Sequence, residues 1–231
     1  MKNISNLRNK HLNKEIWIIG TGKSLDDFPK KFFDDKITIG LNGAICKYDT
    51  TYYFALHKCW WKYIVENKID ILIKSIYETR IDISEKLPKI IKKYLYKMYS
   101  INVLHSWHFT KKDISKMFLD IENGERNIIF LESGTVAHTA IGIAFFLGAN
   151  RITLVGCENK IFEKNEAHAD IDIEYPYASI LNKNPWQNPH PQINIVMRLM
   201  AEQLKKQGYS LRRYYNKNTE FYKKGYEKIN E

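Results

Sequence analysis

Short apolar runs alternate along the chain with longer amphipathic stretches. The runs EIWIIG at 15–20 and RITLV at 151–155 are nearly continuous in apolar character, which is typical of strands that helices cover on both faces. Stretches such as 111–121 instead repeat their apolar residues at helical spacing. The pattern predicts strands at 15–20, 37–41, 51–56, 70–73, 101–105, 127–131, 151–155 and 209–214, and helices at 59–67, 84–98, 111–121, 134–147 and 191–207.

This order of elements predicts an α/β fold. Strands that alternate with helices form a doubly wound, mostly parallel, Rossmann-like sheet. Residues 157–190 are rich in Asn, Asp, Glu and Pro and are too long for an ordinary connection, so we expect them to form a lid. We therefore expect a single Rossmann-like domain over residues 1–214 that includes this lid, followed by a basic C-terminal tail at 215–231.

Composition indicates the cellular compartment that we expect for the protein. A chain of 231 residues with 44% hydrophobic residues can bury a core without disulfides. Its three cysteines are scattered, and its N-terminus carries no apolar run long enough for a signal peptide or a membrane span. We expect a cytoplasmic protein. Because no cysteine pair has metal-ligand spacing, the cysteines indicate neither a metal site nor a redox motif.

The net charge of +10 points to an anionic partner, such as a nucleotide, an acidic lipid face or a nucleic acid. Basic residues stand among tyrosines at 205–228, a composition that suits an anionic membrane surface or a single-stranded nucleic acid. A solvated basic helix and tail gives the same pattern. We expect peripheral contact with an anionic membrane surface and no specific nucleic acid, and the sequence leaves a homo-oligomer open.

The segment GTGKS at 20–24 resembles a phosphate-binding P-loop but does not fit one. The P-loop needs a glycine five residues before its second glycine, and Trp17 stands there, inside an apolar strand. A short Gly-x-Gly turn between a strand and a helix can still hold a phosphate or a nucleotide. We therefore expect a nucleotide-contacting turn at Gly20-Thr21-Gly22.

Other candidates follow from the same rule, that ligands of parallel sheets bind beyond the carboxyl ends of the strands. An asparagine can donate to and accept from a base or ribose edge, and Ser133-Gly134-Thr135 opens a helix with hydroxyls and N–H groups for a phosphate. The plainer interpretations are a turn and a helix cap. The candidates after the strands are Gly20, Thr21, Gly22, Asn42, Gly43, His57, Glu132, Ser133, Gly134, Thr135, Gly156, Cys157 and Glu158.

Four segments together carry a family resemblance: GTGKSL, LNG, SGTVAHTAIGIAFFLGANRITLVGCE and NPHPQINIVMRLM. They resemble the bacterial lipooligosaccharide sialyltransferases and their 6-hydroxymethylpterin diphosphokinase-like and motility-accessory-factor relatives. The resemblance spans most of 15–214 and is most specific from Ser133 to Glu158. It implies a single Rossmann-like domain that uses CMP-sialic acid without a metal and closes a lid over this donor.

The resemblance also implies residue roles. Gly20, Thr21, Gly22 and Asn42 would contact the nucleotide, Ser133 and Gly134 would face its phosphate, and His190 would match the family's general base. An imidazole suits that role at neutral pH. The leaving phosphate needs donors placed in advance, a role for Ser133, Thr135 and Lys160. His190 between two prolines can also simply precede a helix.

The chain departs from the family pattern at several positions. Thr21 and His57 stand where the family has asparagines. In the family, lid tyrosines bind the departing phosphate, but near Gly156 this chain has Glu158, Asn159 and Lys160 instead. Lys160 could neutralise the phosphate, or Tyr175 and Tyr177 further along the chain could reach it. Because these positions contact the donor in the family, the resemblance does not determine which donor this chain uses.

Three other features have competing interpretations. Asp170-Ile171-Asp172, with His168, could hold a metal ion, but no apolar strand precedes this motif as one normally does. His138 lies within a predicted helix and favours a packing role. Trp60-Trp61 could form a platform for an acceptor sugar, although packing against the sheet is the simpler interpretation.

The sequence thus predicts a glycosyltransferase that moves a CMP-activated acid sugar to a surface-glycan acceptor, as in lipopolysaccharide biosynthesis. We expect the reaction to need no metal and no cofactor beyond the nucleotide-sugar donor. One alternative is a diphosphokinase-like phosphotransferase that needs ATP and a divalent metal. Others are a nucleotide- or glycan-binding protein without catalysis, and a basic nucleic-acid binder.

Overall fold

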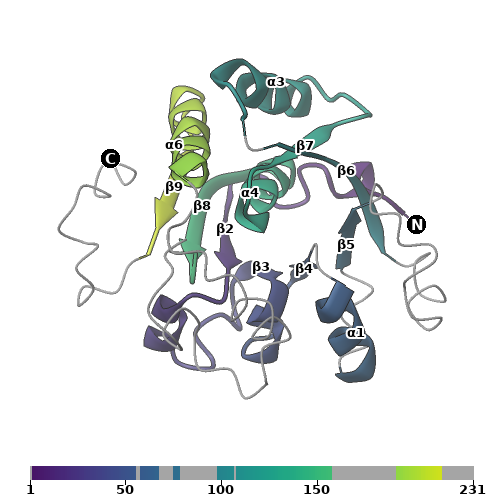
Figure 1. Ribbon diagram of the computed structural model, residues 1–231, viewed down its shortest axis with the longest axis vertical. Helices are drawn as coiled ribbons and strands as arrows, with labels where there is room; N and C mark the ends of the chain where they lie inside the picture. The colour runs from purple at the N-terminus through teal and green to yellow at the C-terminus, as the bar shows by residue number, and fades with distance from the viewer. Residues whose placement is uncertain are drawn as a thin grey trace.

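The computed structural model describes residues 2–55, 58–67, 75–78, 98–106, 108–157 and 191–214. Within these ranges nine strands form one sheet, and every strand pairing is parallel (Figure 1). The chain order is β1 (Lys2–Asn3), η1 (Ile4–Leu7), β2 (Lys14–Ile19), η2 (Lys23–Asp27), β3 (Ile37–Leu41), η3 (Asn42–Cys46), β4 (Tyr52–Phe54), α1 (Lys58–Asn67), β5 (Ser75–Glu78), β6 (Tyr99–His105), α3 (Lys111–Glu122), β7 (Ile129–Glu132), α4 (Val136–Phe146), β8 (Ala149–Val155), α6 (Pro191–Lys206) and β9 (Ser210–Arg213).

The strand order makes the sheet doubly wound. Strands run β1-β6-β5-β4-β3-β2-β8-β9, and β7 pairs with the carboxyl half of β6. From β2 the chain moves outward through β3 and β4, whereas β8 returns to the other side of β2 and leads on to β9. The winding therefore reverses between β2 and β8, the point at which open α/β sheets bind ligands. The predicted Rossmann-like α/β fold is confirmed.

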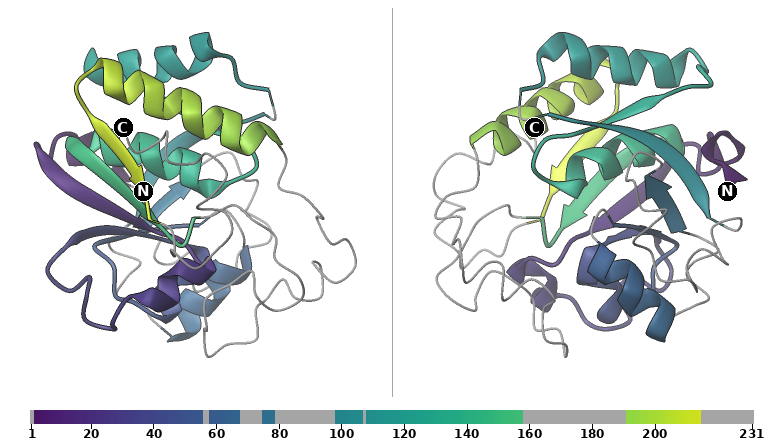
Figure 2. Two further views of the ribbon diagram at one scale, coloured as in Figure 1. Left: turned by 90° about the vertical axis from the view of Figure 1, so that its left-hand side faces the viewer. Right: turned by 45° about the vertical axis from the view of Figure 1, so that its right-hand side comes forward.

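One face of the sheet packs against α3, α4 and α6 (Figures 1 and 2). Ile16 and Ile18 of β2 point to this face and are fully buried. All eleven residues of α4 are buried, because this helix lies between the sheet and both of the other helices. A helix that is apolar on every side is stable only in such a position.

The opposite face is covered by η2, η3 and α1. Trp17 points to this face and contacts Phe33, with ring centroids 5.8 Å apart. Tyr53 of β4 contacts Trp61 of α1 at 5.4 Å. Trp60 and Trp61 are 1% and 0% exposed, so they pack inside the protein and do not form an open sugar platform.

The local patterns located most elements correctly, and the differences have physical causes. β1 and β5 were not predicted. Ser75 and Ile76 of β5 are both fully buried although one is polar, so no alternation of apolar and polar residues marks this strand, which pairs with β4 and β6. The predicted strand at 70–73, nearly all of the helix at 84–98, the lid beyond Cys157 and the tail at 215–231 lie outside the described residues.

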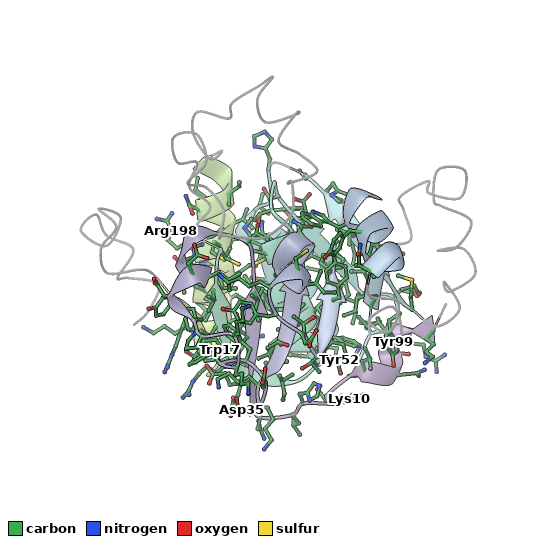
Figure 3. The ribbon with its side chains drawn as sticks, turned by 90° about the horizontal axis from the view of Figure 1, so that it is seen from below. Lys10, Trp17, Asp35, Tyr52, Tyr99 and Arg198 are labelled. Atoms are coloured by element: carbon green, nitrogen blue, oxygen red, sulfur yellow. The ribbon has the colours of Figure 1, made fainter. Side chains whose placement is uncertain are left out.

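The carboxyl ends of the strands share one edge. In Figure 3, Lys10 and Asp35 lie along the lower edge of the sheet. These residues precede β2 and β3, so the lower edge is the amino edge. The carboxyl ends, with the candidate residues that follow them, point the other way.

Candidate functional site

The turn after β2 interlocks with the turn after β8. The N–H of Gly20 donates to the carbonyl of Val155 at 2.7 Å, and the N–H of Gly22 donates to the carbonyl of Gly156 at 2.7 Å. The hydroxyl of Ser24 accepts from the N–H of Gly156 at 3.0 Å. A Cβ atom on Gly20 would lie 2.1 Å from the Gly156 carbonyl oxygen. The glycine is therefore required by close approach of the two turns, and two N–H groups of the predicted nucleotide turn are engaged within the protein.

Asn42 has the features of a binding residue at the carboxyl end of β3. Its backbone lies in the left-handed region, with φ of 50°, a conformation that asparagine tolerates better than most residues. The Tyr53 hydroxyl donates to the Asn42 carbonyl at 3.0 Å and holds this backbone in place. The side-chain oxygen Oδ1 is buried without a hydrogen-bond partner among the described residues. Buried polar atoms are nearly always paired, so this amide oxygen is suited to a donor from outside.

The turn Ser133-Gly134-Thr135 caps the start of α4 and also contains a buried hydroxyl that has no hydrogen-bond partner among the described residues. Thr135 is the N-cap of α4, and its Oγ1 accepts from the N–H of Ala137 at 3.3 Å. Gly134 has φ of 72°, which allows the chain to turn from β7 into the helix. Ser133 is fully buried, and its hydroxyl has no partner among the described residues.

His138 has the predicted packing role. It is fully buried in α4, and its Nε2 lies 3.0 Å from the carbonyl of Ile193 in α6. Burial lowers the pKa of His138 to about 3, the hydrogen bond to Ile193 opposes this shift, and the charge of Arg213 lowers the pKa further. The imidazole is therefore neutral at pH 7 and ties α4 to α6.

A histidine–carboxylate pair that the sequence pattern did not reveal lies at the same edge. Nδ1 of His105 is 2.7 Å from Oε2 of Glu132, and the two residues are register partners at the ends of β6 and β7. Glu132 is among the candidates predicted after the strands, whereas His105 merely ends an apolar run and is not among them. Their separation of 27 residues gives no local signal of contact.

The remaining predicted site residues lie outside the described residues. They are His57, Glu158, Lys160 and His190, together with the Asp170–Asp172 motif. In the described part of the chain no group of three or more His, Cys, Asp or Glu side chains is arranged to hold a metal ion. Nor does any helix there have the length and apolar character needed to cross a bilayer.

Comparison with known proteins gives one solved structure to report. No protein-family model matches the chain, and no curated protein matches it. The sialyltransferase CstII from Campylobacter jejuni, solved with the substrate analogue CMP-3FNeuAc, is 13% identical; the match covers 87% of this chain and 79% of that chain, with a TM-score of 0.35. Because so few residues are shared, roles of individual residues do not transfer between the two chains.

Proposed function

We propose that this chain is a glycosyltransferase that uses a CMP-activated acid sugar as donor, without a metal, and builds a surface glycan. The observation that carries the proposal is Asn42, a left-handed residue whose buried amide oxygen is unsatisfied beside the point where the winding of the sheet reverses. Strained backbone and an unpaired polar atom at one residue are typical of binding sites. The resemblance of its sequence to the sialyltransferases supports the choice of donor.

The proposed mechanism assigns nucleotide contacts to the turn at 20–22 and to Asn42. The Ser133 hydroxyl and the start of α4 serve the donor phosphate, because a helix N-terminus favours negative charge. His190 is proposed as the base, and Lys160 as the cation that neutralises the leaving phosphate. We place the protein in the cytoplasm, in peripheral contact with an anionic membrane surface.

Nucleotide-dependent thermal stabilisation tests the proposal against its alternatives. A ligand that binds only the folded state raises the melting temperature. We expect CMP to do so equally with and without EDTA. Stabilisation by ATP only in the presence of Mg²⁺ would instead support the phosphotransferase. Stabilisation by an oligonucleotide that disappears steeply with added salt would support a nucleic-acid binder.

Asn42→Gly tests the residue that carries the proposal. Glycine keeps the left-handed backbone and removes the side chain with its amide, so the fold should remain while CMP binding weakens by roughly 1–3 kcal/mol in calorimetry. Asn13→Gly is a matched control, because Asn13 is an exposed residue with a similar φ of 58°. Equal CMP affinity of both variants and the unmodified protein would remove Asn42 from the site.

A further inference from the structure

A side chain from the neighbouring strand anchors the backbone of Asn42. A residue other than glycine keeps a left-handed conformation only where the surrounding structure fixes it. At Asn42, with φ of 50°, that structure includes the hydroxyl of Tyr53, which donates to the Asn42 carbonyl at 3.0 Å. Tyr53 lies in β4, which pairs with β3 on the side away from β2. The position of the Asn42 amide therefore depends on a second strand.

Tyr53 is itself held firmly by helix α1. Its side chain is fully buried, and its ring makes an edge-to-face contact with Trp61, with centroids 5.4 Å apart and ring planes at 85°. Trp61 is also fully buried. Edge-to-face contact is a preferred arrangement of aromatic rings. Because both rings are enclosed, the Tyr53 hydroxyl is kept at the Asn42 carbonyl.

The residue after Asn42 is fixed by the same helix. A Cβ atom on Gly43 would lie 2.5 Å from Cη2 of Trp60, so the indole packs directly on the Gly43 backbone. Trp60 is 1% exposed. Both contacts act on the backbone of the Asn42-Gly43 turn. The side-chain oxygen Oδ1 of Asn42 meanwhile has no hydrogen-bond partner among the described residues.

We propose that Tyr53 is a positioning residue for nucleotide binding and acts through Asn42. This assignment rests on the proposed function. The Tyr53 hydroxyl keeps the Asn42 backbone left-handed, and this conformation sets the direction in which Oδ1 meets a donor group of the nucleotide. The role requires no contact between Tyr53 and the nucleotide.

A purely structural hydrogen bond predicts a different result, and Tyr52 provides the matched comparison. Tyr52 is the preceding residue of β4 and is 3% exposed, and its hydroxyl lies 2.9 Å from Nε2 of His11. His11 precedes β2 and so belongs to the amino edge of the sheet, away from Asn42. Loss of either hydroxyl should lower the melting temperature, whereas only loss of the Tyr53 hydroxyl should weaken nucleotide binding.

The test is a double-mutant cycle on CMP affinity, measured by calorimetry. Tyr53→Phe keeps the ring and removes only the hydroxyl, so the fold should remain. CMP binding should weaken about threefold to tenfold, the usual value of one hydrogen bond. Tyr52→Phe should bind CMP as the unmodified protein does. In the Asn42→Gly background, Tyr53→Phe should cause no further weakening, because the amide that it positions is gone.

A second measurement on the protein without nucleotide does not depend on CMP. The Cα and Cβ chemical shifts of Asn42 in NMR spectra report its backbone conformation. Tyr53→Phe should move these shifts away from left-handed values, and Tyr52→Phe should leave them unchanged. If Asn42 keeps its shifts in Tyr53→Phe, the hydroxyl does not hold this backbone and the proposal is wrong.

The outcomes separate this proposal from the proposed function. If CMP binds the unmodified protein and Tyr53→Phe equally well, the role of Tyr53 is wrong and the proposed function stands. The same holds if Tyr53→Phe weakens binding equally with and without the Asn42 amide, or if Tyr52→Phe weakens it as much. If CMP neither binds nor stabilises the unmodified protein, the proposed function fails, and the role of Tyr53 fails with it.

Discussion

Two single residues at the carboxyl edge, Gly20 and Asn42, have unusual backbone environments for different physical reasons. Gly20 has no side chain because the turns after β2 and β8 meet there, and Asn42 adopts a left-handed backbone that most residues avoid. The constraint at Gly20 concerns packing alone. At Asn42 the buried side-chain oxygen Oδ1 has no hydrogen-bond partner among the described residues, which packing alone does not explain. The two residues follow neighbouring strands, but close packing of two turns explains Gly20, whereas packing does not explain the unpaired oxygen of Asn42.

Gly20→Ala should destabilise the fold by about 3 kcal/mol, at the upper end of overpacking costs, because the added Cβ would lie 2.1 Å from a backbone oxygen. Chemical denaturation measures this difference. Gly124→Ala is the control: Gly124 has φ of 76° and nothing within 4 Å of an added Cβ, so only backbone strain of about 1 kcal/mol applies. Equal losses in the two variants would contradict the interlocked turns.

At the scale of elements, α4 connects the site to the core. Thr135 caps its start, all its residues are buried, and it contacts β2, β3, β7 and β8 on the sheet side. Thr139 donates to the carbonyl of Leu131 at 3.1 Å and His138 contacts Ile193, so the helix is hydrogen-bonded to β7 and to α6. The phosphate-facing turn that we propose therefore begins the most enclosed helix of the described chain.

His138 should make the fold sensitive to acid. Its folded pKa of about 3 lies below the usual 6.5, so the unfolded chain takes up a proton that the folded protein does not as pH falls below about 6.5. Each pH unit then costs up to about 1.4 kcal/mol. Urea denaturation at pH 7 and pH 5 should give a loss about 2 kcal/mol larger for the unmodified protein than for His138→Gln. The same change in both proteins would show that His138 is not buried in its neutral form.

At the scale of the whole molecule, distant parts of the chain complete one core. β2 lies inside the sheet between β3 and β8, and β9 extends the sheet beyond β8. Leu211 of β9 joins the main core at 4% exposure, and the N–H of Tyr214 donates to the Leu154 carbonyl at 2.7 Å. The last described strand is therefore part of the folding unit.

Two truncations test this boundary. A chain ending at residue 214 should keep the melting temperature, because all the described core contacts lie within it. A chain ending at residue 208 loses β9, leaves the edge of β8 unpaired and should melt at least several degrees lower or fail to fold. Thermal unfolding measures both. A large loss from removing only 215–231 would show that the predicted tail belongs to the domain.

The sequence predicted elements better than contacts. Continuous apolar runs located β2, β3 and β8, and helical length and spacing located α3 and α4, because these signals lie within a few residues of one another. The sequence also predicted Asn42 and Ser133 as candidates, since each lies within two residues of the end of a predicted strand. It did not predict β5, whose four residues SIYE have no clear pattern and are held by the strands on both sides.

By itself the sequence determined the alternation of most strands and helices, hence the parallel sheet and the edge at which the candidate residues lie. Only the tertiary structure decided which distant residues meet there. Gly20 contacts Gly156, His138 contacts Ile193, and His105 reaches Glu132 because strand register sets the pairing. Local periodicity reports which face of an element is buried, whereas contact between residues far apart depends on how whole elements pack.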